Sequence, residues 1–464
     1  MSAESSITKL EEIKSKLISS TVARERLAIL YDEGKFTELD MFVKQGDTSC
    51  GVITAFGYID GSPVYAFSQD ITINSGALSE NHAKRIKKVY DLASKTGVPV
   101  VGIYDSFGGV VTDGVKVLSA YGELMMWVSN LSGVVPQISV IAGTCASSSA
   151  ILATSADFVI MSKDAELFIT PNSKDLVTSY AENSAKCGTA NLICENDKEA
   201  VEMARAIITK LPMNNLSAIP MFEFEAPVYA MKTEADSMVK SIADVNSVIE
   251  LSEKFGTATY TALATVAGST VGFCATNKTN AKLTADDCSK LARFVRTCDA
   301  FGIPVITIVD TEGFELSDDA ETKGSLRDMT KLVHAYAEAT TAKISLIVGK
   351  AYGPAYIALA GKGANADLTY SYPNAVISPL APETAVEFLM HEKLKGAEDV
   401  AKTRKELADE YCQNEASAFK AAENNCIDDI INPLDTRETI INALDILSGK
   451  RISRLPKKHS NMPF

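Results

Sequence analysis

Residues 50–70 read CGVITAFGYIDGSPVYAFSQD, and residues 257–277 read TATYTALATVAGSTVGFCATN. The first stretch holds two β-rich runs around Asp60-Gly61, a dipeptide that favours the tight turn of a hairpin. The second stretch repeats this form around Ala267-Gly268. We therefore expect two hairpins, about 206 residues apart, that belong to two copies of one structural unit.

The segments after the two hairpins also match. Ser79 and Gly97 have the spacing of a helix N-cap and a helix stop, and Thr284 and Gly302 repeat it. The next nine residues are GVPVVGIYD (97–105) in the first copy and GIPVITIVD (302–310) in the second. Each copy then predicts a long helix and a buried strand: helices at about 114–131 and 324–340, and strands that end at Gly143 and Gly349.

The alternation of strand and helix predicts an α/β fold with parallel strands and right-handed crossovers. A chain of 464 residues is too long for one core. We place the first domain at residues 1–225 and the second at 226–464, with a short helical tail at about 382–450 and a basic end.

Composition excludes several classes of protein. The chain is 46% hydrophobic and 22% charged, which is typical of a folded globular protein, and its net charge of -14 argues against a nucleic-acid binder. Nine scattered cysteines describe no disulfide framework, and the charged N-terminal helix is no secretory signal. No apolar run is long enough to span a bilayer. We expect a cytoplasmic protein that could still be the soluble subunit of a membrane complex.

Two glycine- or serine-bearing turns could carry chemistry. CASSS (145–149) and YGPA (352–355) each follow a predicted strand and open a helix, where free backbone N–H groups suit a developing oxyanion. Tight packing between helix and strand is the alternative explanation of the small residues. Asp105 and Asp310 could form a catalytic pair, although an aspartate at a strand end more often caps a loop.

Other catalytic signatures are weak. The four histidines form no HExxH pattern and accompany no nucleophile motif, and no P-loop could hold a nucleoside triphosphate. We therefore expect neither a metal nor a nucleotide cofactor. The tetrapeptide AMKT (230–233) is similar to the motif around a biotinylated lysine, but it lacks the second methionine and the surrounding β-rich domain.

Across nearly its whole length the chain resembles the carboxyltransferase subunit of biotin-dependent acyl-CoA carboxylases and decarboxylases, of the propionyl-CoA carboxylase beta and methylmalonyl-CoA decarboxylase alpha type. The motifs that carry the resemblance stand in the family's order. They include ARERLAILYDEGKFTELD (23–40), SGVVPQISVIAGTCA (132–146), HAYAEATTAKISLIVGKAYGPAYIAL (334–359) and KKHSNMPF (457–464). The resemblance implies a tandem pair of crotonase-like (ClpP/crotonase) ββα-superhelix domains.

It also implies a transfer of CO2 between an acyl-CoA and carboxybiotin on a separate carrier protein, with a biotin carboxylase or a membrane decarboxylase subunit as a further partner. The first domain would bind the thioester, with backbone N–H groups near Gly108, Gly109, Ser147 and Ser148 facing the enolate oxygen and with Phe107 and Ala146 beside them. The second would bind biotin, with Gly353 and Ala355 facing the ureido oxygen and with Gly313, Phe314, Tyr352 and Pro354 around it. Members of the family assemble as hexamers whose active sites combine the first domain of one subunit with the second domain of another.

The chain departs from the family pattern at several of these positions. Phe107 stands at a usual glycine, Val110 at an arginine, Ser147 and Ser148 at a glycine pair, and Glu312 at a proline. Pro354 replaces a glycine and removes one N–H outright. Most of a segment after Thr170 is also missing.

Three hypotheses about the function follow from the sequence. The first is an active carboxyltransferase or decarboxylase subunit. The second is a catalytically weakened paralogue that acts as a scaffold or a regulatory partner of an active homologue, and the third is a crotonase-fold enzyme that acts on a thioester without biotin.

Overall fold

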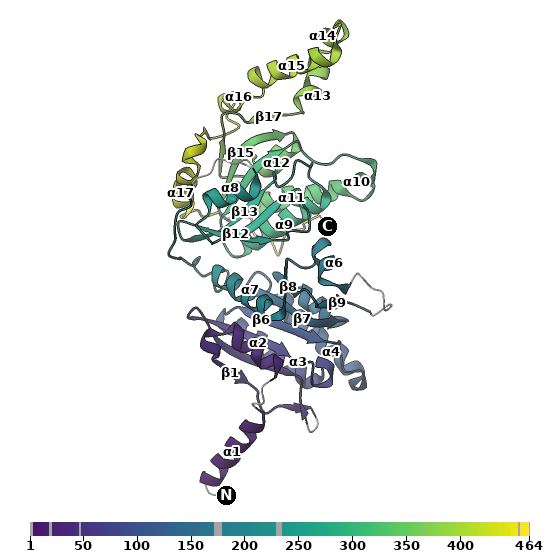
Figure 1. Cartoon of the computed structure of the whole chain (residues 1–464), viewed down its shortest axis with the longest axis vertical. Coiled ribbons are helices and arrows are strands. Elements are labelled where there is room, and N and C mark those ends of the chain that lie inside the picture. The colour runs from purple at the N-terminus through teal and green to yellow at the C-terminus, as the bar shows by residue number, and fades with distance from the viewer. Residues whose placement is uncertain are drawn as a thin grey trace. The chain divides into compact units, whose positions relative to one another are not determined.

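The computed structural model describes residues 3–17, 21–45, 48–170, 179–228, 234–363, 365–452 and 455–463 (Figure 1). The chain forms two compact units, Met1–Ala218 and Ile219–Phe464. The division falls before the predicted boundary because residues around 222 already belong to the second unit: Phe222 N donates to Gly268 O over 2.9 Å, and Val245 N donates to Glu225 O over 2.9 Å. The AMKT tetrapeptide at 230–233 lies outside the described residues.

An eight-stranded sheet organises the first unit, in the order β1-β4-β5-β6-β7-β8-β10 with β9 beside β7. The strands β1, β4 and β5 pair antiparallel, and the pairs from β5 to β10 are parallel. Its main elements are α1 Ala3–Leu17, α2 Val22–Leu30, β1 Phe36–Leu39, β4 Val52–Ile59, β5 Ser62–Gln69, α3 Glu80–Thr96, β6 Val100–Ser106, α4 Val115–Leu131, β7 Gln137–Ala146, α5 Ser148–Thr154, β8 Phe158–Ser162, β9 Glu166–Phe168, α6 Ala181–Lys186, β10 Leu192–Cys194 and α7 Asp197–Lys210; β2 Lys44–Gln45 and β3 Thr48–Ser49 form a separate ribbon.

The second unit repeats this strand order as β11-β12-β13-β14-β15-β16-β18 with β17 beside β15, so the predicted duplication is confirmed. Its helices α9 and α11 pack against each other, as α3 and α4 do in the first unit (Figure 1). Its elements are α8 Ala235–Ile242, β11 Ile249–Leu251, β12 Tyr260–Val266, β13 Ser269–Ala275, α9 Ala285–Ala300, β14 Val305–Thr311, α10 Asp318–Thr322, α11 Ser325–Glu338, β15 Lys343–Tyr352, α12 Pro354–Leu359, β16 Leu368–Ser371, β17 Val376–Ser378, α13 Pro382–Leu389, α14 His391–Lys395, α15 Val400–Asn414, α16 Ala418–Glu423, β18 Asp429–Ile430 and α17 Thr436–Leu447.

The expectation of a helical tail at 382–450 is wrong in part. Helices α13 to α15 have their own small hydrophobic cluster, which includes Val386, Leu407 and Tyr411. The later β18 pairs with β16, and α17 contributes the fully buried Ile440 to the main core of the second unit. The end of the chain therefore completes the second sheet and its core.

Both hairpin turns have the backbone that their sequences predict, with φ of 47° and 75° at Asp60-Gly61 and of 49° and 79° at Ala267-Gly268. In each unit an aspartate accepts hydrogen bonds from both turn N–H groups: Asp32 over 3.1 Å and 3.1 Å, and Asp244 over 3.0 Å and 2.9 Å. Arg205 of α7 pairs with the first aspartate, and Arg437 of α17 pairs with the second. The duplication thus extends to contacts between segments that are distant in the sequence.

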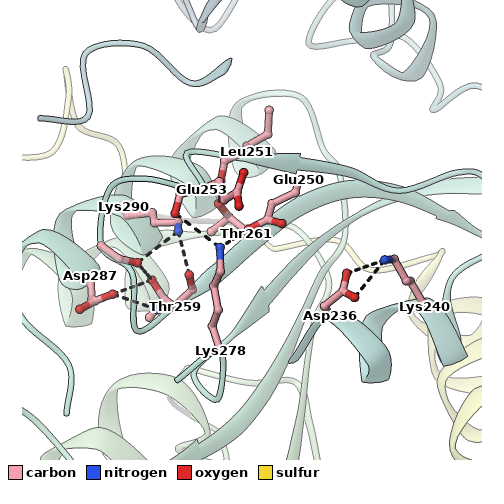
Figure 2. Close-up of polar contacts among 11 residues, drawn as sticks. Asp236, Lys240, Glu250, Leu251, Glu253, Thr259, Thr261, Lys278, Asp287 and Lys290 are labelled. Carbon is pink, nitrogen blue, oxygen red and sulfur yellow. Dashed lines mark hydrogen bonds and ion pairs between the residues drawn. The ribbon is translucent and has the colours of Figure 1, made fainter. Parts of the chain in front are cut away.

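A buried cation stands at the same place in α3 and α9, six residues after the N-cap. In the first unit Arg85 donates to Glu38 over 3.1 Å. In the second, Lys290 donates to the carbonyl oxygens of Thr259 over 2.8 Å and Gly256 over 3.2 Å (Figure 2). Its burial lowers the pKa of the Lys290 ammonium to about 8, because little water remains to solvate the charge.

Among the described residues, no helix is long and apolar enough to cross a membrane.

Candidate functional site

The loop after β6 presents one free backbone donor. Gly108 N donates to Ser106 Oγ over 3.2 Å, and the carbonyl of Gly108 accepts from Leu78 N over 2.7 Å. Val110 N donates back to Leu78 O over 2.9 Å, so the N–H of the intervening Gly109 points to the opposite side, as in a strand. No described residue accepts a hydrogen bond from that N–H.

The turn after β7 brings a second donor close to this loop. Ser147 has φ 58° and caps α5, and a Cβ added at Gly108 would lie 3.2 Å from Ser147 Cβ. The N–H of Ser147 donates to Phe168 O in β9 over 2.9 Å. Ser148 is the first residue of α5, and its N–H has no partner inside the helix. The N–H of Ser149, the second residue of α5, has no intrahelical partner either. The first unit therefore leaves the N–H groups of Gly109, Ser148 and Ser149 free for an anionic oxygen.

The second unit repeats this geometry with one donor fewer. Gly313 N donates to Thr311 Oγ1 over 3.2 Å, and the hydrogen bonds around Leu283 leave the N–H of Phe314 pointing away in the same manner. Gly353 has φ 51° and donates its N–H to Ser378 O over 2.8 Å. Pro354, the counterpart of Ser148, has no N–H to offer. The remaining donors are Phe314 and Ala355.

The structure thus brings together several predicted residues within each unit: Gly108 with Ala146 and Ser147, and Gly313 with Tyr352. Three of the N–H groups that the sequence suggested as donors are already bound within the protein: that of Gly108 by Ser106, and those of Ser147 and Gly353 by neighbouring strands. Phe107 is 58% exposed at the rim of the first loop.

Asp105 and Asp310 support the backbone around these loops. Asp105 is buried and accepts from Arg26 Nη1 over 2.9 Å, and Asp310 accepts from Lys350 N over 2.8 Å. A Cβ at Gly143 or Gly349 would lie 2.4 Å or 2.3 Å from the facing carboxylate oxygen, so only glycine fits at either position. These contacts favour the interpretation of both aspartates as loop supports over that of a catalytic pair.

Two features lie beside the loops of the second unit. Lys350 Nζ donates to Glu312 over 2.6 Å, which lowers the pKa of that half-exposed carboxyl and raises the pKa of the amine. A cavity of about 520 Å³ with mostly apolar walls opens beside Pro354. Six of the residues that line it are Gly353, Pro354, Tyr356, Ile357, Ile377 and Lys420.

The hydroxyl groups that shape the glycine loops were not predicted from the sequence. Ser106 and Thr311 follow the paired aspartates directly, so an alignment of the two copies contains the signal that could have found them. The carbonyl groups of Phe168 and Ser378 carry no such signal, because any residue supplies a carbonyl. Among the described residues, no cluster of three or more histidine, cysteine, aspartate or glutamate side chains could hold a metal ion.

Comparison with known proteins gives consistent matches over nearly the whole chain. The model of the carboxyl transferase domain matches residues 19–462. The methylmalonyl-CoA decarboxylase subunit alpha of Propionigenium modestum is 37% identical over 95% of this chain and 93% of that protein. A putative propionyl-CoA carboxylase beta chain of Bacillus subtilis is 36% identical over the same shares. The crystal structure of transcarboxylase 12S with methylmalonyl-coenzyme A and methylmalonic acid bound, a hexamer, matches with a TM-score of 0.93 and 30% identity over 100% of both chains.

Proposed function

The chain belongs to the carboxyl transferase domain family, and from this premise we propose that it moves a carboxyl group between an acyl-CoA thioester and biotin carried on a separate protein. It is a carboxyltransferase of the propionyl-CoA carboxylase and methylmalonyl-CoA decarboxylase type, and its α/β fold is the predicted tandem crotonase-like pair. Methylmalonyl-CoA and propionyl-CoA are the thioesters that we expect it to use. The observation that carries the finer proposal is the pairing of a glycine loop with a helix N-terminus, found once in each unit.

We assign the acyl-CoA to the first unit. Removing a proton or a carboxyl group next to a thioester leaves negative charge on the carbonyl oxygen. The N–H groups of Gly109 and Ser148 would stabilise this charge, because they are held in place before the reaction and need no reorganisation. The positive end of the short helix α5 adds to the effect over its first turn.

We assign biotin to the second unit. The N–H groups of Phe314 and Ala355 suit its ureido oxygen, and the apolar cavity beside Pro354 suits its ring and chain. The set of donors therefore fits the cofactor, with one donor lost at Pro354. In one direction carboxybiotin would supply the carboxyl group and its ring nitrogen would take the proton that the acyl group loses, and in the other direction that nitrogen would accept the carboxyl group.

In this proposal the chain itself contributes binding, orientation and electrostatic stabilisation. No side-chain nucleophile or histidine base is needed, which agrees with the sequence. Neither donor depends on a side chain, so Ser147 and Ser148 can replace the family's glycines as long as the turn keeps its backbone shape.

The partners that we propose are a biotin carrier protein, a biotin carboxylase or a membrane decarboxylase subunit, and further copies of this chain in a hexamer such as that of transcarboxylase 12S. The active site would then combine the first unit of one subunit with the second unit of another. The cytoplasmic location stays a prediction.

A transfer assay tests the proposal. The purified chain is mixed with a biotin carrier or free biotin and with methylmalonyl-CoA, malonyl-CoA or glutaconyl-CoA, and the decarboxylated thioester is measured. Turnover of one thioester that depends on biotin supports the proposal. Thioester binding without turnover favours the weakened paralogue, and turnover without biotin favours another thioester reaction.

A further inference from the structure

Tyr121 of α4 lies next to both donor segments of the first unit. Its hydroxyl lies 2.6 Å from Ser149 Oγ, and both side chains are buried. A Cβ added at Gly109 would lie 3.5 Å from Cε2 of Tyr121, so the edge of the ring flanks the glycine loop. One side chain therefore lies beside Gly109, which carries the first donor, and hydrogen-bonds to Ser149, the neighbour of the second donor Ser148.

We infer that Tyr121 is a positioning residue that, through Ser149, fixes the separation of the Gly109 and Ser148 N–H groups. The inference rests on the proposed function of these groups as an oxyanion site. Oxyanion stabilisation depends on donors held at a set position, and a displacement of a fraction of an ångström weakens it. A helix of seven residues cannot hold its own first turn firmly, because that turn contains no completed set of intrahelical bonds.

The second unit supplies an internal contrast. Ala355 occupies the position of Ser149, and an alanine has no hydroxyl group to bind. There Pro354 occupies the first position of α12 and fixes its own φ, so that turn is stiffened by a different means. The Tyr121–Ser149 hydroxyl pair thus occurs in the unit whose short helix begins with a free N–H, at Ser148, and its counterpart is absent where the helix begins with Pro354.

The environment of Tyr121 supports a lasting neutral hydrogen bond. Burial raises the pKa of the phenol to about 12, so the hydroxyl keeps its proton across the working range of pH. Cys145 lies nearby at the end of β7, and burial raises the pKa of its thiol well above the usual range. The Tyr121–Ser149 hydrogen bond therefore serves as a fixed support of the first turn of α5.

The test compares Tyr121→Phe and Ser149→Ala with the wild-type chain in the biotin-dependent transfer assay. Tyr90→Phe is the matched control, because Tyr90, on the neighbouring helix α3, is an equally buried tyrosine whose ring packs against Phe67. We expect each test variant to lower kcat about tenfold while KM for the thioester stays within about twofold. The kcat of the double variant should be no lower than that of either single variant, because both substitutions remove the same hydrogen bond.

Unchanged kcat in both folded test variants, a rise confined to KM, or an equal loss in the Tyr90→Phe control would overturn the inference. Hydrogen exchange of the amides at the start of α5 gives a second readout that does not require activity. Faster exchange in both test variants and not in the control supports the positioning role even if the wild-type chain transfers no carboxyl group, in which case only the proposed function fails. Unchanged exchange in an inactive chain overturns the inference as well.

Discussion

Replacing Pro354 with serine should raise the rate of carboxyl transfer, because the change restores a backbone N–H that the second unit lacks. Pro354 and Ser148 are both first residues of a short helix, and the residues before them have nearly the same backbone, with φ and ψ of 51° and -127° at Gly353 and of 58° and -134° at Ser147. A serine can therefore adopt the conformation of Pro354, with its N–H beside those of Phe314 and Ala355.

The magnitude follows from the value of one oxyanion donor, which is about 2.7 to 4 kcal/mol, or a factor of about 100 to 1,000 in kcat. Two donors are already present, so we expect Pro354→Ser to raise kcat by roughly tenfold to a hundredfold. The lost ring restriction should lower the free energy of unfolding by about 0.4 to 1 kcal/mol. The reverse change, Ser148→Pro, removes a donor from the first unit and should lower kcat by about a hundredfold. It should fold normally, since proline is well tolerated at the first position of a helix.

The assay is biotin-dependent transfer from methylmalonyl-CoA, with thermal unfolding measured in parallel. Pro433→Ser is the matched control, because Pro433 also begins a helical turn and lies outside both donor sets. A folded Pro354→Ser chain with no gain in kcat, together with a folded Ser148→Pro chain that keeps its full rate, would refute the assignment of these backbone donors. Activity that appears only in Pro354→Ser would identify the natural chain as the weakened paralogue.

Three further predictions concern stability. The pKa of Lys290 (Figure 2) is about 8 in the folded chain and about 10.5 in the unfolded chain, so the unfolded chain binds more protons between these pH values and the free energy of unfolding rises with pH. In urea unfolding, the wild type should gain up to about 3 kcal/mol of stability relative to Lys290→Met from pH 7 to pH 10. Parallel pH dependences of the two chains would contradict this. Arg26→Met leaves the buried carboxylate of Asp105 without its ion pair and should lower the free energy of unfolding by about 3 to 5 kcal/mol in the same assay. Lys84→Met, which removes an exposed ion pair, should change it by no more than about 0.5 kcal/mol. Equal effects would refute the role of burial. Gly143→Ala should lower Tm by crowding a carboxylate, while Gly122→Ala, on the exposed face of α4 with no atom within 4 Å, should add about 1 kcal/mol; a tolerated Gly143→Ala would contradict the close approach.

Much of the fold could be predicted from the sequence because its signals are local. The turn at Asp60-Gly61 needs φ above zero at two successive positions, and the dipeptide itself favours that backbone. Ser79 and Thr284 cap the predicted helices through contacts within a few residues, and the repeated pattern after them predicts the same parallel strands in both units. The candidate turns at Ser147 and Gly353 were found in the same way, since a strand that runs into a helix across small residues is a local pattern.

The identity of the free donors was decided only by tertiary structure. Whether the N–H of Ser147 or Gly353 is available depends on a carbonyl that lies 21 or 25 residues further along the chain, at Phe168 or Ser378. Backbone carbonyls are chemically alike, so the sequence carries no mark of which one will pair. The same holds for Tyr121, whose hydroxyl meets Ser149 only because α4 and α5 pack together. The sequence alone predicted a turn from strand to helix with free backbone N–H groups in each unit, and the packing of distant strands and helices determined which of those N–H groups stay free.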